Sequence, residues 1–405
     1  MLLGSMPPMP IGGAEIQAIR IYKALTAQDI KIKVLTWGKL WHKKKDTYSN
    51  VPFVRIKSVL NLVTDIPSVF KKKNQGSAKK TKIVYNDKLE ITNQVTSKVW
   101  FGMILRYKLF YVNCLVHLWL RRHQFDIIHV HMMEWPAIVA VKIGKILNKP
   151  VVIKDSTMNG IFNLLRYPAG QEKQKEIAEY AYCVAMTKVI HANYLQAGVP
   201  PEKIADIPNG IETFELPKPG DQKWSNKVVF VGNLTQQPAK GVDILLSAWK
   251  QVIKIVTGAT LHIIGDGDID SYQKFVNEQG IEKSVIFLGK QQNIKDRLNE
   301  ADIFVLPSRR EGMSNALMEA LLCAKPVVAT RVSGSEDLIE DKVSGILVHI
   351  SDIDELAKGI IYMLTNKEHA IEMGLKGRQS ILEKCDMNLV ASKYIQLYNK
   401  ILGNA

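Results

Sequence analysis

The chain contains the stretch Ile303-Phe304-Val305-Leu306-Pro307-Ser308-Arg309-Arg310-Glu311-Gly312-Met313-Ser314-Asn315-Ala316-Leu317-Met318-Glu319-Ala320 (303–320). Its first four residues are apolar and are followed by a proline, which predicts a buried strand of a parallel sheet. Ser314 is a typical N-cap residue, and the spacing predicts a helix over 315–323. Glu311 is therefore expected in the strand-to-helix loop, and Glu319 a little over one turn into the helix.

The positions of the two glutamates suit a nucleotide sugar. The N-cap and Glu319 are roughly 7 Å apart along the helix, which is comparable to the reach of a diphosphate between two sugars. The helix start between them presents free N–H groups and a positive dipole end, both of which favour phosphate. One carboxylate can accept hydrogen bonds from hexose hydroxyls and the other from ribose hydroxyls. The alternative is that both are ordinary acidic residues near a helix start.

Both halves of the chain alternate strand and helix, the pattern of parallel α/β domains. At 405 residues the chain suggests two domains. We place the first at 1–213, a Pro/Gly-rich linker at 214–226 and the second at 227–385. The expected strands are 32–36, 126–131, 150–153, 183–186, 204–210, 228–231, 260–267, 285–289 and 303–306, with helices at about 14–26 and 136–147.

Composition excludes several classes of protein. The four cysteines are far apart and show no metal-ligand spacing, which favours reduced thiols in the cytosol. Residues 1–10 lack the basic start and continuous apolar core of a signal peptide. We therefore expect a cytoplasmic protein without a bound metal.

The positive charge is concentrated in the first half. Residues 1–220 hold 32 Lys/Arg and 16 Asp/Glu, whereas 221–405 hold 22 and 23; residues 39–122 alone hold 18 and 4. A single basic region points to an anionic surface, such as the inner face of a membrane, rather than to nucleic acid. A solvated basic insert is the alternative.

Residues 98–122 are largely apolar with one narrow polar stripe. Arg106 and Lys108 lie in mid-segment, and each would cost about 2.5–3.5 kcal/mol in a membrane span. We expect a mostly buried helix here, with contact at a membrane surface as the alternative.

Two neighbouring motifs resemble the donor-site signature of retaining glycosyltransferases of family 4. They are Pro307-Ser308-x-x-Glu311-Gly312-x-x-Asn315-x-x-x-Glu319-Ala320 and, after it, Lys325-Pro326-Val327-Val328-Ala329-Thr330. The resemblance covers nearly the whole chain apart from about 40–97. It implies the GT-B fold, in which two Rossmann-like domains face each other across a cleft. It also implies that a final helix, about 386–405, returns to the first domain.

The resemblance implies roles for particular residues. His131 would contact the donor sugar, Lys240 would neutralise the departing diphosphate, and Glu311 would hold the transferred sugar. His129 is expected to be structural, and a zinc pair of the two histidines has no evident third ligand. The positions that would bind the donor are Gly12, Gly13, Asn233, Lys240, Gly265, Lys290, Glu311, Gly312, Ser314, Asn315, Ala316 and Glu319.

Three positions depart from the family pattern. Asn233 stands where the family has an arginine, so more of the phosphate stabilisation would fall on Lys240 and the helix amides; Arg309 or Arg310 could compensate. Ala324 and Lys342 stand where glycine is common, and we interpret both as variation in packing.

The expected activity is transfer of a sugar, with retention of configuration, from a nucleoside-diphosphate sugar to a saccharide or lipid-linked acceptor in cell-surface polysaccharide or glycolipid assembly. The resemblance implies front-face displacement without a metal. Two alternatives stay open: a GT-B nucleotide-sugar 2-epimerase, and a non-enzymatic protein that binds polyanions or membranes.

Overall fold

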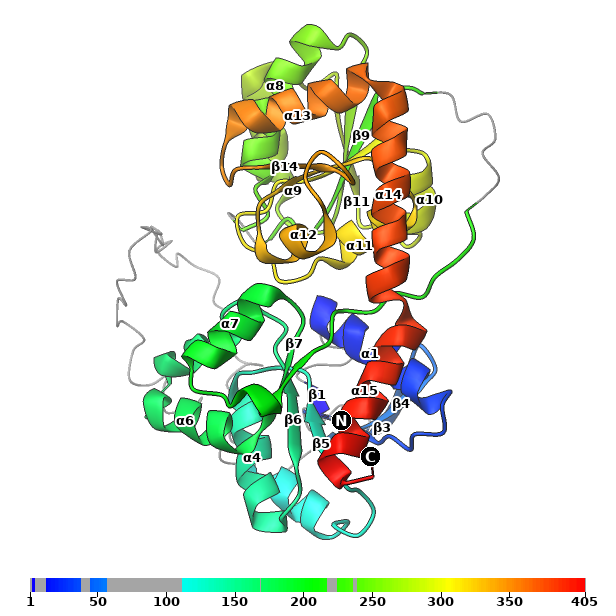
Figure 1. Ribbon diagram of the computed structural model, residues 1–405. Coiled ribbons are helices and arrows are strands. Elements are labelled where there is room, and N and C mark those ends of the chain that lie inside the picture. Colours follow the sequence, from blue (N-terminus) through cyan, green and yellow to red (C-terminus); the bar gives the residue numbers. More distant parts are fainter. Residues whose placement is uncertain are drawn as a thin grey trace, which may run out of the picture.

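The computed structural model describes residues 12–37, 44–56, 111–167, 169–216, 224–235 and 239–404, together with the short strand Leu2–Leu3. Within these residues the chain forms two α/β units, each built on its own sheet and drawn one above the other in Figure 1.

The first sheet has eight strands in the order β3-β4-β2-β1-β5-β6-β7-β8, and only the β3–β4 pair is antiparallel. Its elements are β1 (Leu2–Leu3), α1 (Gly13–Thr26), β2 (Val34–Trp37), β3 (Lys45–Tyr48), β4 (Val51–Ile56), β5 (Ile128–Val130), α4 (Trp135–Leu147), β6 (Val151–Lys154), α5 (Gly160–Asn163), η2 (Leu164–Arg166), α6 (Gly170–Tyr180), β7 (Tyr182–Ala185), α7 (Lys188–Gln196), η3 (Pro201–Lys203) and β8 (Ile204–Asp206).

The second sheet has six parallel strands in the order β11-β10-β9-β12-β13-β14. Its elements, with the two helices that end the chain, are β9 (Lys227–Val231), α8 (Val242–Ile255), β10 (Thr260–Ile264), α9 (Ile269–Gln279), β11 (Val285–Gly289), α10 (Ile294–Asn299), β12 (Ile303–Leu306), α11 (Asn315–Leu322), β13 (Val327–Thr330), α12 (Ser333–Leu338), β14 (Ile346–Val348), α13 (Ile353–Thr365), α14 (Lys367–Cys385) and α15 (Met387–Leu402). The expected strands over 32–306 and the helices expected at about 14–26, 136–147 and 315–323 are confirmed, with ends that shift by up to four residues.

Helices cover both faces of the second sheet, which explains why its strands are apolar without alternation. In β12, Phe304 and Leu306 pack in one core cluster with α11, whereas Ile303 and Val305 pack in another with α8 and α13. All four side chains of this strand are buried. The predicted N-cap is confirmed: the Ser314 hydroxyl accepts a hydrogen bond from the Leu317 N–H at 3.4 Å.

The chain passes between the two units at two adjacent places. The Ile211 N–H donates to the Cys385 carbonyl at 2.9 Å, and the Met387 N–H donates to the Ile211 carbonyl at 3.0 Å. Asp386 separates α14 from α15 and caps the second helix. Beyond it α15 packs on α1 and on the first sheet, where Val390 and Tyr394 share a cluster with Ile21 and Val152 (Figure 1).

The prediction of a mostly buried helix over 98–122 is wrong for the part that the structure describes. Residues 111–119 are helical. Cys114 and Leu118 are buried, but Val112, Val116 and Trp119 are about half exposed. The helix therefore buries only one stripe; residues 98–110 lie outside the described residues, as do 4–11 and 57–97 of the first domain. No helix among the described residues is both long and apolar enough to cross a membrane.

Candidate functional site

The loop between β12 and α11 lies at the carboxyl edge of the second sheet, where open α/β sheets bind ligands. It carries Glu311, and Lys240 meets it from the turn before α8. The Lys240 Nζ lies 2.6 Å from the Glu311 Oε2, and both side chains are more than four-fifths buried. Ser308 donates a weaker hydrogen bond to the same oxygen at 3.3 Å. The structure thus brings together two of the three residues predicted to be catalytic, Lys240 and Glu311.

Gly241 allows this approach. It has a φ of +65°, and an added Cβ would lie 1.9 Å from the Pro307 carbonyl oxygen. The turn before α8 can therefore touch the loop after β12 only with a glycine here.

Asn233, which stands in place of the family arginine, and Arg309, one of its two possible substitutes, both bond to other residues. Asn233 uses its side-chain oxygen to accept hydrogen bonds from the Thr235 N–H and hydroxyl, at 2.8 and 2.5 Å. Arg309 pairs bidentately with Asp243, at 2.8 and 2.6 Å. This hydrogen-bonded pairing raises the pKa of the arginine. Lys240 is thus a cation that lies directly beside Glu311.

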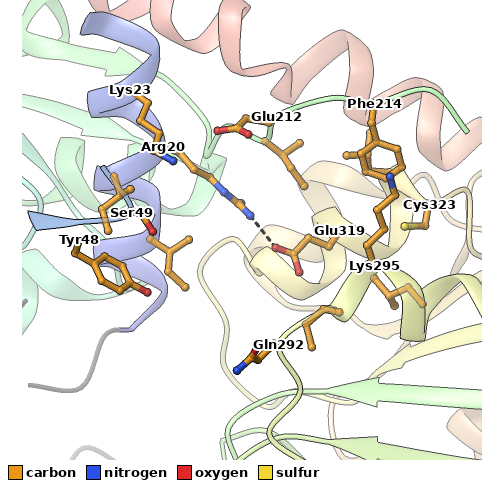
Figure 2. A pocket seen from close by; sticks show the side chains of 16 residues that line it. Arg20, Lys23, Tyr48, Ser49, Glu212, Phe214, Gln292, Lys295, Glu319 and Cys323 are labelled. Carbon is orange, nitrogen blue, oxygen red and sulfur yellow. Dashed lines mark hydrogen bonds and ion pairs between the residues drawn. The ribbon is translucent and has the colours of Figure 1, made fainter. Parts of the chain in front are cut away.

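The start of α11 faces the start of α1 across the two units. Gln17 donates to the Asn315 side-chain oxygen at 2.6 Å and to the Gly210 carbonyl at 3.0 Å. One turn along, the Arg20 Nη2 lies 2.8 Å from the Glu319 Oε1 (Figure 2). Sequence reasoning missed Gln17 and Arg20, because nothing local shows which helix they face.

Gly12 and Gly13 lie where the start of α1 meets the start of α11. The Gly12 N–H donates to the Glu15 carboxylate at 3.0 Å, and α1 begins at Gly13. A Cβ on Gly13 would lie 3.2 Å from the Asn315 amide nitrogen. The first N–H groups of α11, at Asn315 and Ala316, have no partner within their own helix. Two helix starts therefore converge, and both favour an anion.

A second line of contact joins the units beside the donor loop. The Asn209 amide donates to the Met313 carbonyl at 3.1 Å, and Ser333 donates to Thr187 at 2.7 Å. A Cβ on Gly312 would lie 2.7 Å from the Met186 methyl. The donor loop is thus held closely against the first unit.

Glycines stand at the carboxyl ends of β10 and β11, where two of the predicted donor-binding positions lie. The Gly265 N–H donates to the Gly289 carbonyl at 3.0 Å, so the ends of β10 and β11 lie together. A Cβ on Gly265 would meet the Gly232 carbonyl oxygen at 1.8 Å. Lys290 follows directly and is exposed.

His131 makes no hydrogen bond to the donor loop among the residues that the structure describes. It is buried at the end of β5, and its ring stacks on His129 with centroids 4.4 Å apart. His129 contacts the Tyr398 hydroxyl at 2.7 Å, which suits a structural role. Burial lowers the pKa of both histidines well below the usual value. Both rings are therefore neutral near pH 7.

Lys154 ends the neighbouring strand β6 and was not singled out by the sequence. The register pairs Val130 with Ile153, so His131 and Lys154 are the next residues along the two strands. The lysine is 2% exposed, and within the part of the chain that the structure describes its Nζ has no hydrogen-bond partner. Burial lowers its pKa to about 7.

An open cavity of about 430 Å³ lies between the units, beside Glu319. Its walls carry Arg20, Lys23 and Tyr48 from the first unit and Gln292, Lys295 and Glu319 from the second (Figure 2). The cavity thus offers charged groups of both signs and an aromatic ring next to the start of α11. No cluster of three or more potential metal ligands occurs within the described residues.

Two Rossmann-like units that meet across such a junction define the GT-B class, and solved structures of that class match the whole chain. They include HepE of Anabaena with UDP (TM-score 0.69, 18% identity, 98% of each chain). Another is sucrose-phosphate synthase of Thermosynechococcus elongatus (TM-score 0.73, 17% identity, 100% of this chain and 99% of that one).

The sequence patterns of two families match the chain: Glycosyltransferase Family 4 over residues 11–214 and Glycosyl transferases group 1 over 225–366. The chain belongs to glycosyltransferase family 4. It is 28% identical over 201 residues to the poly(ribitol-phosphate) α-N-acetylglucosaminyltransferase of Staphylococcus aureus, and covers 40% of that protein with 49% of its own length. It is 27% identical over 305 residues to the N-acetyl-α-D-glucosaminyl L-malate synthase of Bacillus anthracis, with 70% of this chain and 76% of that one covered.

Proposed function

We propose that this protein transfers a sugar from a nucleoside-diphosphate sugar to an acceptor hydroxyl with retention of anomeric configuration. The observation that carries the proposal is the arrangement around the start of α11. Glu311 with Lys240 lies on one side of that helix start, and Glu319 lies one turn into the helix beside the cavity.

Each group has a part in the proposed reaction. Glu319 accepts hydrogen bonds from the ribose hydroxyls, and Glu311 accepts them from the transferred sugar. The diphosphate lies at the N–H groups of Asn315 and Ala316. As the bond from the anomeric carbon to the diphosphate breaks, Lys240 stabilises the negative charge that builds on the leaving oxygen. The acceptor oxygen bonds to the anomeric carbon from the same face, and its proton passes to the departing phosphate.

A uridine nucleotide is the first donor to test. Solved structures of similar fold hold UDP or UDP-glucose. One relative, 25% identical over 270 residues, is named a UDP-Gal:α-D-GlcNAc-diphosphoundecaprenol α-1,3-galactosyltransferase of Escherichia coli.

An anionic acceptor in cell-surface glycan assembly suits the charge. The basic first half would attract a polymer or lipid that carries phosphate. The names of two relatives include acceptors of this kind, poly(ribitol-phosphate) and a diphosphoundecaprenol saccharide. We place the enzyme in the cytoplasm, at the inner face of the membrane.

The test is a panel of UDP-, GDP- and ADP-sugars, each incubated with the protein alone and with phosphate-bearing glycan acceptors. Release of nucleoside diphosphate and a glycoside whose anomeric configuration matches that of the donor, read by NMR, are the expected results. Conversion of the donor to its 2-epimer without transfer would instead indicate an isomerase. A product of inverted configuration would contradict the front-face mechanism.

A further inference from the structure

Two polar side chains of the proposed donor site each bond to a side chain of α1. Asn315 and Glu319 are four residues apart on α11, and Gln17 and Arg20 are three apart on α1. Residues at these spacings lie on one face of a helix. The two faces meet as two bonds, of 2.6 Å between Gln17 and Asn315 and 2.8 Å between Arg20 and Glu319.

The Arg20–Glu319 pair is only half satisfied. Arg20 bonds to Glu319 through Nη2, while its buried Nη1 has no hydrogen-bond partner among the described residues. In contrast, Arg309 engages Asp243 with two parallel bonds. A single-point pair is weaker and less specific than a bidentate one. Because Glu319 also borders the cavity, a ligand can reach the carboxylate that Arg20 holds (Figure 2).

We propose that Arg20 is a built-in competitor for Glu319, which the ribose of the donor must displace. This inference rests on the proposed function, because it takes Glu319 as the ribose ligand. Arg20 and Glu319 belong to different units, so displacement releases one of the bonds between α1 and α11. The bond from Gln17 to Asn315 still joins the two helices after this displacement.

The competition has a measurable consequence. When a binding-competent state is only part of the population, the apparent dissociation constant rises in inverse proportion to that fraction. Removing the competitor should therefore tighten nucleotide binding. Loss of a positive charge near an anionic ligand would by itself act in the opposite direction, so the sign of the change separates a competitor from a residue that helps to bind.

The experiment is calorimetric titration of UDP into the wild type, Arg20→Gln and Lys23→Gln. Lys23 lines the same cavity one turn further along α1 and forms no ion pair with the described residues, so it controls for loss of charge alone. We expect Arg20→Gln to bind UDP about threefold to tenfold more tightly, and Lys23→Gln to bind with unchanged or weaker affinity. Equal or weaker UDP binding by Arg20→Gln would overturn the proposal.

A second measurement does not need a nucleotide. Spin labels at Lys175→Cys on α6 and Lys274→Cys on α9 report the distance between the units, because both side chains are about 80% exposed. The four natural cysteines are buried and compete little for the label. Arg20→Gln should broaden this distance distribution in the absence of nucleotide, because one bond between the units is lost, and an unchanged distribution would overturn the role of the pair in joining the units. If UDP, GDP and ADP all fail to bind the wild type, the proposed function fails, while this distance still tests the pair.

Discussion

Glu319 and Glu311 carry different parts of the proposed site. Glu319→Ala should weaken UDP binding by about 10- to 100-fold, because a charged hydrogen-bonding partner of the ribose is lost. Glu311→Ala should leave UDP affinity nearly unchanged and lower the rate of transfer. Calorimetry with UDP and a transfer assay on both variants are the measurements. Equal UDP affinity in the wild type and both variants would show that neither carboxylate holds the nucleoside.

Lys240 supplies, in our proposal, the positive charge that a divalent ion supplies in other transferases. We expect transfer to continue in excess chelator, and Lys240→Met to lower it by about 10²- to 10³-fold, the usual loss for one group that stabilises a developing anion. Activity that is abolished by chelator and restored by manganese or magnesium would contradict this.

Lys154 makes stability depend on pH. Burial holds its pKa at about 7 in the folded protein, below the usual 10.5. Between these values the unfolded chain binds more protons, so the contribution of Lys154 to the free energy of unfolding rises with pH and is least favourable below about 7. The free energy of unfolding of Lys154→Met should therefore exceed that of the wild type most at pH 7, and by progressively less toward pH 10.

Urea unfolding at several pH values measures this difference. Lys175→Met is the control, since that lysine is 79% exposed and its removal should leave the pH dependence unchanged. A gain for Lys154→Met that stays constant from pH 7 to pH 10 would contradict the assignment.

Ala324 and Lys342 show why a family glycine can matter even away from the chemistry. Both adopt the left-handed region, with φ of +54° and +62°. The interpretation of these departures as variation in packing is therefore wrong. A side chain in this region carries a conformational cost that glycine lacks.

Among the elements, α15 is the one that closes the core of the first unit. Met387 is buried, and its methyl would lie 2.5 Å from a Cβ on Gly210, so it fills the junction tightly. Met387→Ala should lower the free energy of unfolding by about 2–5 kcal/mol, because it leaves a cavity. Leu389 lies on the same helix and is 39% exposed. Leu389→Ala should therefore change the free energy of unfolding by at most about 0.5 kcal/mol. Urea unfolding followed by circular dichroism compares them; similar losses would show that α15 does not contribute to the core in this way.

At the scale of the whole molecule, the chain combines a basic half with an exposed apolar helix end. Trp119 and Leu120 are at least half exposed, and the Arg122 guanidinium lies 4.7 Å from the centre of the Trp119 ring. Each Lys or Arg near an anionic membrane can contribute about 1 kcal/mol, and salt screens this attraction. We expect cosedimentation with anionic vesicles at low salt, less at high salt, and less for the double variant Trp119→Ala with Leu120→Ala.

Neutral vesicles are the control for this prediction. Binding that ignores lipid charge, or no binding at low salt, would leave the basic region as a solvated surface. Most of that region, at 57–110, lies outside the described residues, so the vesicle experiment bears on it directly.

The sequence alone determined the features that have local causes. Apolar runs such as 303–306 form strands because their side chains are buried on both faces of a sheet, and Ser314 starts a helix because its hydroxyl caps a free N–H group. The Glu311–Lys240 pairing was within reach of the sequence only through the resemblance to family 4, which assigned both residues to one site.

Only the tertiary structure decided which distant groups meet. Arg20 and Glu319 are 299 residues apart, and Gln17 and Asn315 are 298 apart. Their contact depends on how the two units are placed, which no local pattern records. Likewise, the spacing of His129 and His131 predicts a shared face but not its burial against α15, whose path back to the first unit sets that environment. Periodicity acts within one element, whereas these contacts are set by the packing of whole units.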